Sequence, residues 1–202
     1  NKMEHKIENG KHEIVKNEKY NKIVSEISTM IELAKNYDSK VKNVKLESLN
    51  DIINRNGKIY INVSGNKEAV EAINFCLNNK IKNIVIVGEI TNDMAINMLK
   101  ENDIPVLLTG IQNLPRYNDS PIWETNYLPA KLTKAGVLVG MYYDSHGGTW
   151  RTRNLPFNAG NAVAFGLSKT DALKMITLNN AKILGIDKQV GSIEVGKHAT
   201  FL

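Results

Sequence analysis

The chain has 202 residues, of which 42% are hydrophobic and 23% are charged, and its formal net charge at pH 7 is +5. A chain of this length can bury a sizeable core, and this composition is typical of a soluble globular protein. The single cysteine, Cys76, excludes an internal disulfide, and no apolar run approaches the length of a membrane span. The positive charge comes from scattered lysines, which favours a solvated surface over nucleic-acid binding.

The first part of the chain predicts helices after a polar start. Asn1–Lys19 shows no usable period, so we expect a loop or a fraying end, and His5 and His12 within it are more typical of solvated side chains than of a metal site. Tyr20–Tyr37 carries apolar residues at helical spacing, which indicates an amphipathic helix whose stripe belongs to a core. Leu46–Ile53 predicts a second, short helix.

From Gly57 onward, predicted strands alternate with predicted helices. The strands are Lys58–Val63, Asn83–Val87, Ile104–Leu108 and Gly136–Tyr143. The helices are Lys67–Asn79, Asn92–Asn102, Leu128–Ala135 with Pro129 in its first turn, and one that begins after the N-cap Ser168 and runs to about Leu184. A long loop is expected at Thr109–Asn126. This alternation predicts a parallel α/β sheet with right-handed crossovers, which amounts to half of an eight-stranded barrel. Cys76 lies in an apolar helical pattern, which favours a buried, inert thiol over a nucleophile.

The last predicted strand ends at Asp144, and a glycine-rich loop with His146, Trp150, Arg151 and Arg153 follows it. An acidic residue at the carboxyl end of a barrel strand is where (β/α)8 enzymes place their chemistry. Asp144 therefore has two readings, as a general base or as a residue that caps the following loop. The arginines could bind a carboxylate or a phosphate, or could hold the loop to a helix end.

Several motifs in order resemble one family. The order AGV, a strand ending in Asp, RNLPF, DALK, AKILGI and VGSIEVGK is similar to the carboxyl-terminal part of the amidohydrolase superfamily, in its imidazolonepropionase-like and prolidase-like branch. The resemblance covers about Lys45 to Leu202. It implies the fifth to eighth strands of a (β/α)8 (TIM-type) barrel and the start of a return to a small β-sandwich. The implied division is residues 1–45 as a helical or irregular segment, 46–186 as the half barrel and 187–202 as the start of the return.

The resemblance implies metal-dependent hydrolysis of non-peptide C–N bonds or related amide bonds. The family binds zinc or another divalent metal through a His-x-His pair on the first strand, a Lys or carboxylate on the fourth, His on the fifth and sixth, and Asp on the eighth. The fifth-strand position falls at Asn62 and the sixth near Gly88, so neither carries His. An amide oxygen is a weak zinc ligand and glycine offers none, so we expect no metal site in this chain alone. Asp144 is the catalytic candidate, with Asp119, Glu89 and His146 as further acidic or imidazole groups nearby.

His146, Trp150 and Arg153 are the candidates for binding a substrate, since the resemblance places them beyond the strand end on the active face. Two functions stay open: one part of a C–N hydrolase that acts on a small molecule, or an inactive protein of the same fold that binds or acts as a scaffold. We expect neither nucleic acid nor membrane as a partner. Half a parallel barrel has open edges, so we expect self-association or pairing with the missing amino-terminal half of the barrel.

Overall fold

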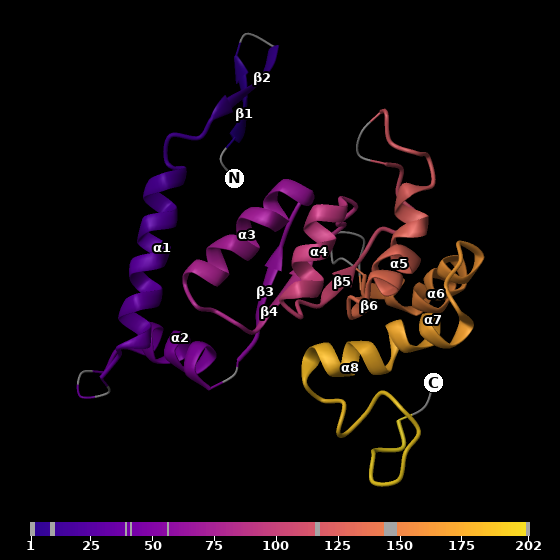
Figure 1. Cartoon of the computed structure of the whole chain (residues 1–202). Helices are drawn as coiled ribbons and strands as arrows, with labels where there is room; N and C mark the ends of the chain where they lie inside the picture. The colour runs from indigo at the N-terminus through magenta and orange to yellow at the C-terminus, as the bar shows by residue number, and fades with distance from the viewer. Residues whose placement is uncertain are drawn as a thin grey trace. The chain divides into compact units, whose positions relative to one another are not determined.

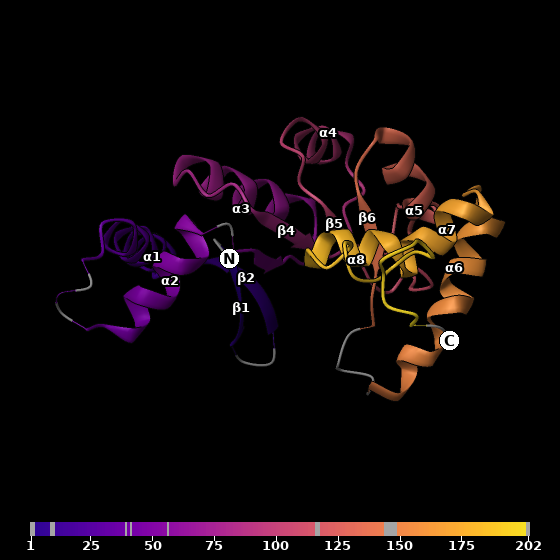
Figure 2. The same ribbon diagram turned by 90° about the horizontal axis from the view of Figure 1, so that it is seen from below.

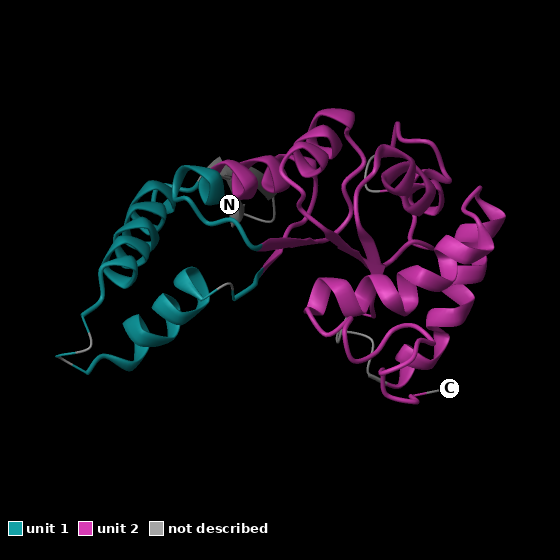
Figure 3. Cartoon of the chain, turned by 60° about the horizontal axis from the view of Figure 1, so that its bottom comes forward, with its two compact units in different colours: residues 1–59, 75–83 teal, residues 60–74, 84–202 magenta. Residues whose placement is uncertain are grey.

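The computed structural model describes residues 3–8, 11–38, 40, 42–55, 57–115, 118–143 and 149–200. The chain divides into two compact units (Figure 3). Unit 1 comprises residues 1–59 and 75–83, and unit 2 comprises residues 60–74 and 84–202. No described helix is both long enough and apolar enough to cross a membrane.

Unit 1 begins with an antiparallel hairpin. β1 (Met3–Glu8) pairs with β2 (Lys11–Lys16), with Met3 opposite Lys16 and Glu8 opposite Lys11. The prediction of a loop or a fraying end was wrong for these residues. A hairpin is held by backbone hydrogen bonds between its strands, and these need no hydrophobic period in the sequence.

Two helices follow the hairpin, as predicted: α1 (Tyr20–Lys35) and α2 (Val44–Asn54). The Asn43 side chain accepts a hydrogen bond from the backbone of Leu46 and caps α2. Asn50 on α2 donates to the Ala34 carbonyl at the end of α1, with 2.7 Å between the two atoms. The apolar stripe of α1 is core only toward its end: Ile31 and Ala34 are buried, whereas Ile23 and Ile27 are each 46% exposed.

The predicted parallel sheet is confirmed, with strand order β3-β4-β5-β6 (Figure 1). Its strands are β3 (Ile59–Asn62), β4 (Ile84–Val87), β5 (Val106–Leu108) and β6 (Val139–Met141). The connecting helices are α3 (Asn66–Asn78), α4 (Asp93–Glu101) and α5 (Glu124–Ala135). All four residues of β4 are buried, as expected for a strand covered on both faces. The alternation of strands and helices that predicted this sheet therefore holds along the chain.

Two details between β5 and β6 correct the sequence prediction. α5 begins at Glu124, not at Leu128, so the loop before it is shorter than expected. Pro129 consequently lies inside the helix and not in its first turn. The first turns of α5 bury Thr125, Asn126 and Leu128 in the interior, and this packing outweighs the local effect of the proline.

After β6, the described residues from 149 to 184 are mostly helical, and those from 185 to 200 form turns and irregular backbone. The helical part forms the 3-10 helix η2 (Thr149–Asn154) and the helices α6 (Leu155–Ala164), α7 (Lys169–Ile176) and α8 (Leu178–Leu184). Ser168 caps α7 by accepting a hydrogen bond from Asp171, as predicted. The single helix predicted from Ser168 to about Leu184 was wrong, because the backbone at Thr177 (φ −130°, ψ −95°) leaves the helical region and separates α7 from α8.

The sheet carries side chains on two faces, which the strand register identifies. Ile86, Val106 and Val139 stand side by side and are buried on one face. The other face carries Val85, Val87 and Leu107, and it packs against Ile183 of α8 together with Leu138 and Tyr142. Figure 2 shows α8 beside the sheet, and its contacts include β6. α8 therefore covers part of this face of the sheet.

Cys76, on α3, is 3% exposed. Burial raises the pKa of its thiol to about 11, because the thiolate loses hydration there. The prediction that Cys76 is buried is confirmed, and the raised pKa favours an unreactive thiol.

Candidate functional site

The candidate site lies at the carboxyl ends of the parallel strands, which share one edge of the sheet. The backbone bonds from Ile59 to Asn83 and from Val63 to Val87 set the register of β3 on β4. This register places Asn62 beside Val87, on the same face as Leu107. Asn62 thus occupies the face that α8 packs against.

Asn62 and Gly88 are the strand-end positions where the family resemblance predicts histidine ligands. The Asn62 side chain is exposed and is a poor match for zinc, which prefers nitrogen and sulfur ligands. Gly88 has a φ of +148°, and a Cβ added to it would lie 2.4 Å from the Val63 carbonyl oxygen. The backbone therefore leaves no room for any side chain at Gly88.

Within the described residues, no three His, Cys, Asp or Glu side chains lie close enough together to hold a metal ion. Asp144 and His146, two of the predicted site residues, lie outside the described residues. The described strand ends, with an exposed amide at Asn62 and a crowded glycine at Gly88, do not fit a hydrolytic zinc ion.

Glu89 and Asp119 are the other acidic candidates from the sequence. Glu89 is half-buried, and its carboxylate reaches the loop after β5, where a Cβ on Gly110 would lie 2.9 Å from Glu89 Oε1. The same added Cβ would lie 2.2 Å from the Asn113 amide nitrogen. Asp119 is exposed. The close approach of Glu89 and Asn113 explains why a glycine, with a φ of +66°, stands at position 110.

Trp150 and Arg153, the predicted substrate-binding residues, are brought together on η2. The guanidinium carbons of Arg151 and Arg153 lie 5.2 and 5.4 Å from the centroid of the Trp150 ring. At these distances the ring attracts both cations. Trp150 is 58% exposed, so the group forms a cationic, aromatic surface that could receive a planar or anionic molecule.

The structure adds a polar anchor that the sequence analysis missed. The Tyr143 hydroxyl, one residue before Asp144, donates to Asn158 Oδ1 on α6 over 3.4 Å. Asn158 is 6% exposed, and Asn126 donates to Asn161 one turn further along α6 over 3.1 Å. The sequence signal for this anchor was the set of three asparagines on α5 and α6. Asparagine side chains that become buried normally form hydrogen bonds.

A second missed group is the amide pair of α8, Asn179 and Asn180. Asn179 Nδ2 donates to the Val139 carbonyl over 2.8 Å, and Asn180 Nδ2 donates to the Met141 carbonyl over 2.9 Å. A Cβ on Gly140, between these two carbonyls, would lie 2.1 Å from Asn180 Oδ1. The pair therefore fixes β6, the strand that leads into Asp144.

α8 also contacts β3, the strand at the other edge of the sheet from β6. The Tyr60 hydroxyl on β3 donates to the Ile183 carbonyl over 3.3 Å. Burial raises the pKa of this phenol, so it remains a neutral donor at physiological pH. The helix thus links the first and last strands of the four-stranded sheet.

Comparison with known proteins identifies relatives among the imidazolonepropionases. The protein of that name from Syntrophobacter fumaroxidans is 44% identical over 78 residues, which are 38% of this chain and 18% of the relative. The imidazolonepropionase of Pseudomonas fluorescens is 33% identical over 113 residues, covering 55% of this chain and 27% of the relative. The chain therefore spans about a quarter or less of these two relatives.

Solved structures share the fold over most of the chain. An amidohydrolase from Thermotoga maritima superposes with a TM-score of 0.63 at 24% identity, covering 89% of this chain and 46% of that one. An adenosine deaminase from Xanthomonas campestris with bound zinc has a TM-score of 0.51 at 17% identity, covering 91% of this chain and 47% of that one. Both agree with a partial (β/α)8 barrel. The sequence model of the amidohydrolase family matches residues 17–202, and the chain belongs to that family.

Proposed function

We propose that this chain is the carboxyl-terminal part of an amidohydrolase-fold protein that hydrolyses a non-peptide C–N bond of a small molecule. The family match and the imidazolonepropionases among the relatives support the reaction class. We further propose that the chain does not complete a metal centre by itself.

One observation carries the second part of the proposal. The backbone at Gly88 holds a φ of +148°, and Val63 fills the space that a side chain would need. A histidine could not be introduced at this strand end without moving β3 or β4. A catalytic zinc site normally has three protein ligands and an open position, and the described strand ends supply none of its histidines.

The remaining residues receive roles as proposals. Asp144 would accept a proton as the general base, and His146, Trp150 and Arg153 would bind the substrate. The exposed Trp150 ring with its two arginines supports a planar or anionic substrate group. The complementary barrel half, or a second copy of the chain, would supply the groups that are missing.

The poor fit of the described strand ends to zinc also supports an alternative function. This alternative is an inactive amidohydrolase-fold protein that binds a small molecule or serves as a scaffold. Metal content tests whether the chain completes a metal centre by itself. We expect the purified chain to retain much less than one zinc per chain after dialysis, measured by elemental analysis, and to show no amide or cyclic ureide hydrolysis. One zinc per chain that survives dialysis and is lost in Asp144→Ala, but kept in the control Asp119→Ala, would overturn the proposal.

A further inference from the structure

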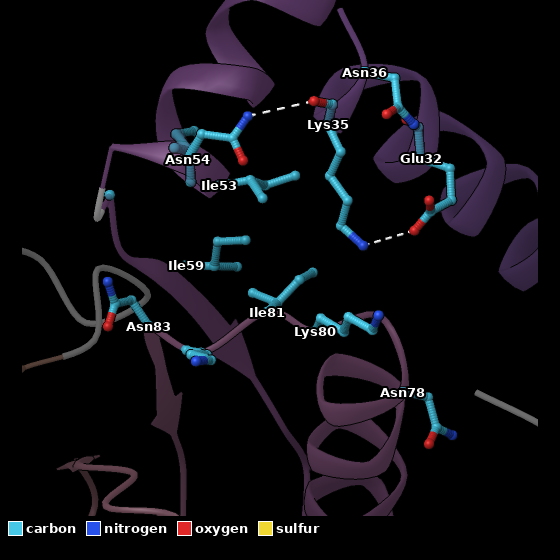
Figure 4. Close-up of a pocket in the computed structure, with 13 residues that line it drawn as sticks. Glu32, Lys35, Asn36, Ile53, Asn54, Ile59, Asn78, Lys80, Ile81 and Asn83 are labelled. Carbon is cyan, nitrogen blue, oxygen red and sulfur yellow. Dashed lines mark hydrogen bonds and ion pairs between the residues drawn. The ribbon is translucent and has the colours of Figure 1, made fainter.

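Unit 1 contains a pocket of about 460 Å³, bordered by the last turns of α1 and α2, the start of β3 and the segment that follows α3 (Figure 4). Ile59 is the first residue of β3, whereas Asn62 is the last. The pocket therefore adjoins the amino-terminal end of this strand and is separate from the candidate site. Its volume falls within the range of small-molecule sites, roughly 300–1,000 Å³.

The lining of the pocket is mostly polar, but it includes a group of isoleucines. Ile53, Ile59 and Ile81 lie in the middle of the hollow in Figure 4, and Ile81 is 6% exposed. These side chains come from α2, β3 and the segment after α3, so the tertiary fold brings them together. Such a surface favours the apolar body of a ligand.

The border of the pocket carries a surplus of positive charge. Lys35 is paired with Glu32, with 2.6 Å between Nζ and Oε1. Lys80 and Lys82 also border the pocket, and neither ammonium makes an ion pair or a hydrogen bond with another described residue. Two cations are thus available to an incoming anion.

Lys80 and Lys82 are not needed to balance the carbonyl groups at the ends of the surrounding helices. Carbonyl groups at a helix end carry partial negative charge, which lysines often balance. Here the last carbonyls of α1 already accept amide donors: Asn36 Nδ2 lies 3.0 Å from the Glu32 oxygen and Asn54 Nδ2 lies 3.5 Å from the Lys35 oxygen. The carbonyls of Cys76 and Leu77 on α3 accept backbone N–H groups of Ile81 and Lys80.

Lys80 stands in a conformation that lysine rarely adopts. Its φ is +55°, at the position after α3 where helices usually place glycine. The left-handed region is unfavourable for a side chain with a Cβ. Lys80 is thus a lysine in a strained backbone conformation at the border of the pocket.

We propose that this pocket binds a small organic anion, a carboxylate with an apolar chain of several carbons. Lys80 and Lys82 hold the carboxylate, and the isoleucines hold the chain. The site lies outside the residues proposed for hydrolysis, so the ligand is not the substrate of that reaction.

The test is a ¹H–¹⁵N NMR titration of the full chain with hexanoate, compared with acetate and with the uncharged hexanamide. We expect saturable shifts in the amides of Asn54 and of the segment from Lys80 to Asn83. Hexanoate should bind at least tenfold more tightly than either comparison compound. In the variant Lys80→Ala/Lys82→Ala its affinity should fall at least tenfold. Equal binding of hexanamide, unchanged affinity in the variant or shifts confined to other residues would each overturn the proposal.

A matched pair of variants separates function from stability. Lys80→Gly relieves the left-handed strain and should raise Tm by a few degrees while weakening hexanoate binding. Asp103→Gly makes the same change after α4, where Asp103 has a φ of +51° and does not border the pocket. It should raise Tm and leave hexanoate binding unchanged. If Lys80→Gly and Asp103→Gly bind hexanoate equally well, Lys80 has no part in the site.

Discussion

Gly140→Ala should destabilise the chain through the amide pair of α8. A Cβ at position 140 would lie 2.1 Å from Asn180 Oδ1, 2.9 Å from Leu107 Cδ2 and 3.0 Å from Ile183 Cδ1. The methyl tips of Leu107 and Ile183 can rotate away, but the Asn180 amide is tied to the Met141 carbonyl. The added methyl group therefore displaces Asn180 and breaks this hydrogen bond.

The expected loss of stability combines two effects. Overpacking a buried site costs roughly 1–3 kcal/mol. Leaving a buried carbonyl without its donor costs about 1–3 kcal/mol more. We therefore expect the free energy of unfolding to fall by roughly 2–6 kcal/mol. Urea unfolding followed by far-UV circular dichroism measures this change.

Two variants make the result interpretable. Gly160→Ala serves as the control, because nothing lies within 4 Å of a Cβ there and the residue is inside α6, where alanine is favoured. It should be neutral or stabilising by up to about 1 kcal/mol. In an Asn180→Ala background, Gly140→Ala should cost at least about 1 kcal/mol less than in the wild type. If the cost is the same in both backgrounds, Asn180 is not the group that the added methyl displaces.

Three further outcomes are expected. Gly88→Ala should destabilise by about 2–4 kcal/mol in the same assay, because its φ and the Val63 carbonyl both exclude a Cβ, and wild-type stability would show that β3 can move aside. Ser168→Ala should cost about 1 kcal/mol through loss of the α7 cap, with the exposed Ser25→Ala as a neutral control. Cys76 should resist alkylation by iodoacetamide at pH 8 until urea unfolds the chain, and fast reaction of the native chain would refute its burial. Because burial raises the Cys76 pKa from 9.0 to about 11, the unfolded chain loses this proton first, so stability should decline as pH rises from 9 toward 11.

The sheet could be predicted from the sequence because each strand is a short apolar run bounded by polar residues. Val85 and Ile86 exemplify this: both are buried, on opposite faces, as a continuous apolar run predicts. The break at Thr177 could not be predicted in this way, since the apolar spacing continues through it. The hairpin of β1 and β2 carried a signal that the periodicity argument overlooked, the Asn9-Gly10 dipeptide, which favours two-residue hairpin turns.

The candidate site was less predictable than the fold. The absence of histidine at Asn62 and Gly88 could be read directly from the sequence, but its structural cause at Gly88, the close Val63 carbonyl, required the backbone. Stacking of Trp150 with Arg153 was equally hidden, because sequence proximity does not specify side-chain direction. The roles of Asp144 and His146 stay predictions.

The residues that stabilise the sheet differ from the strand-end positions where the family resemblance predicts metal ligands. The sheet is stabilised by Val85, Val87 and Ile183 and by the amide pair of α8 that bonds to β6. None of these is at a position where the resemblance predicts a metal ligand. Asn62, the last residue of β3, is exposed and therefore adds little apolar burial. At the end of β4, Gly88 allows β3 and β4 to approach more closely than a side chain there would permit. Placing a ligand side chain at this position would therefore require a change in the backbone as well as in the residue.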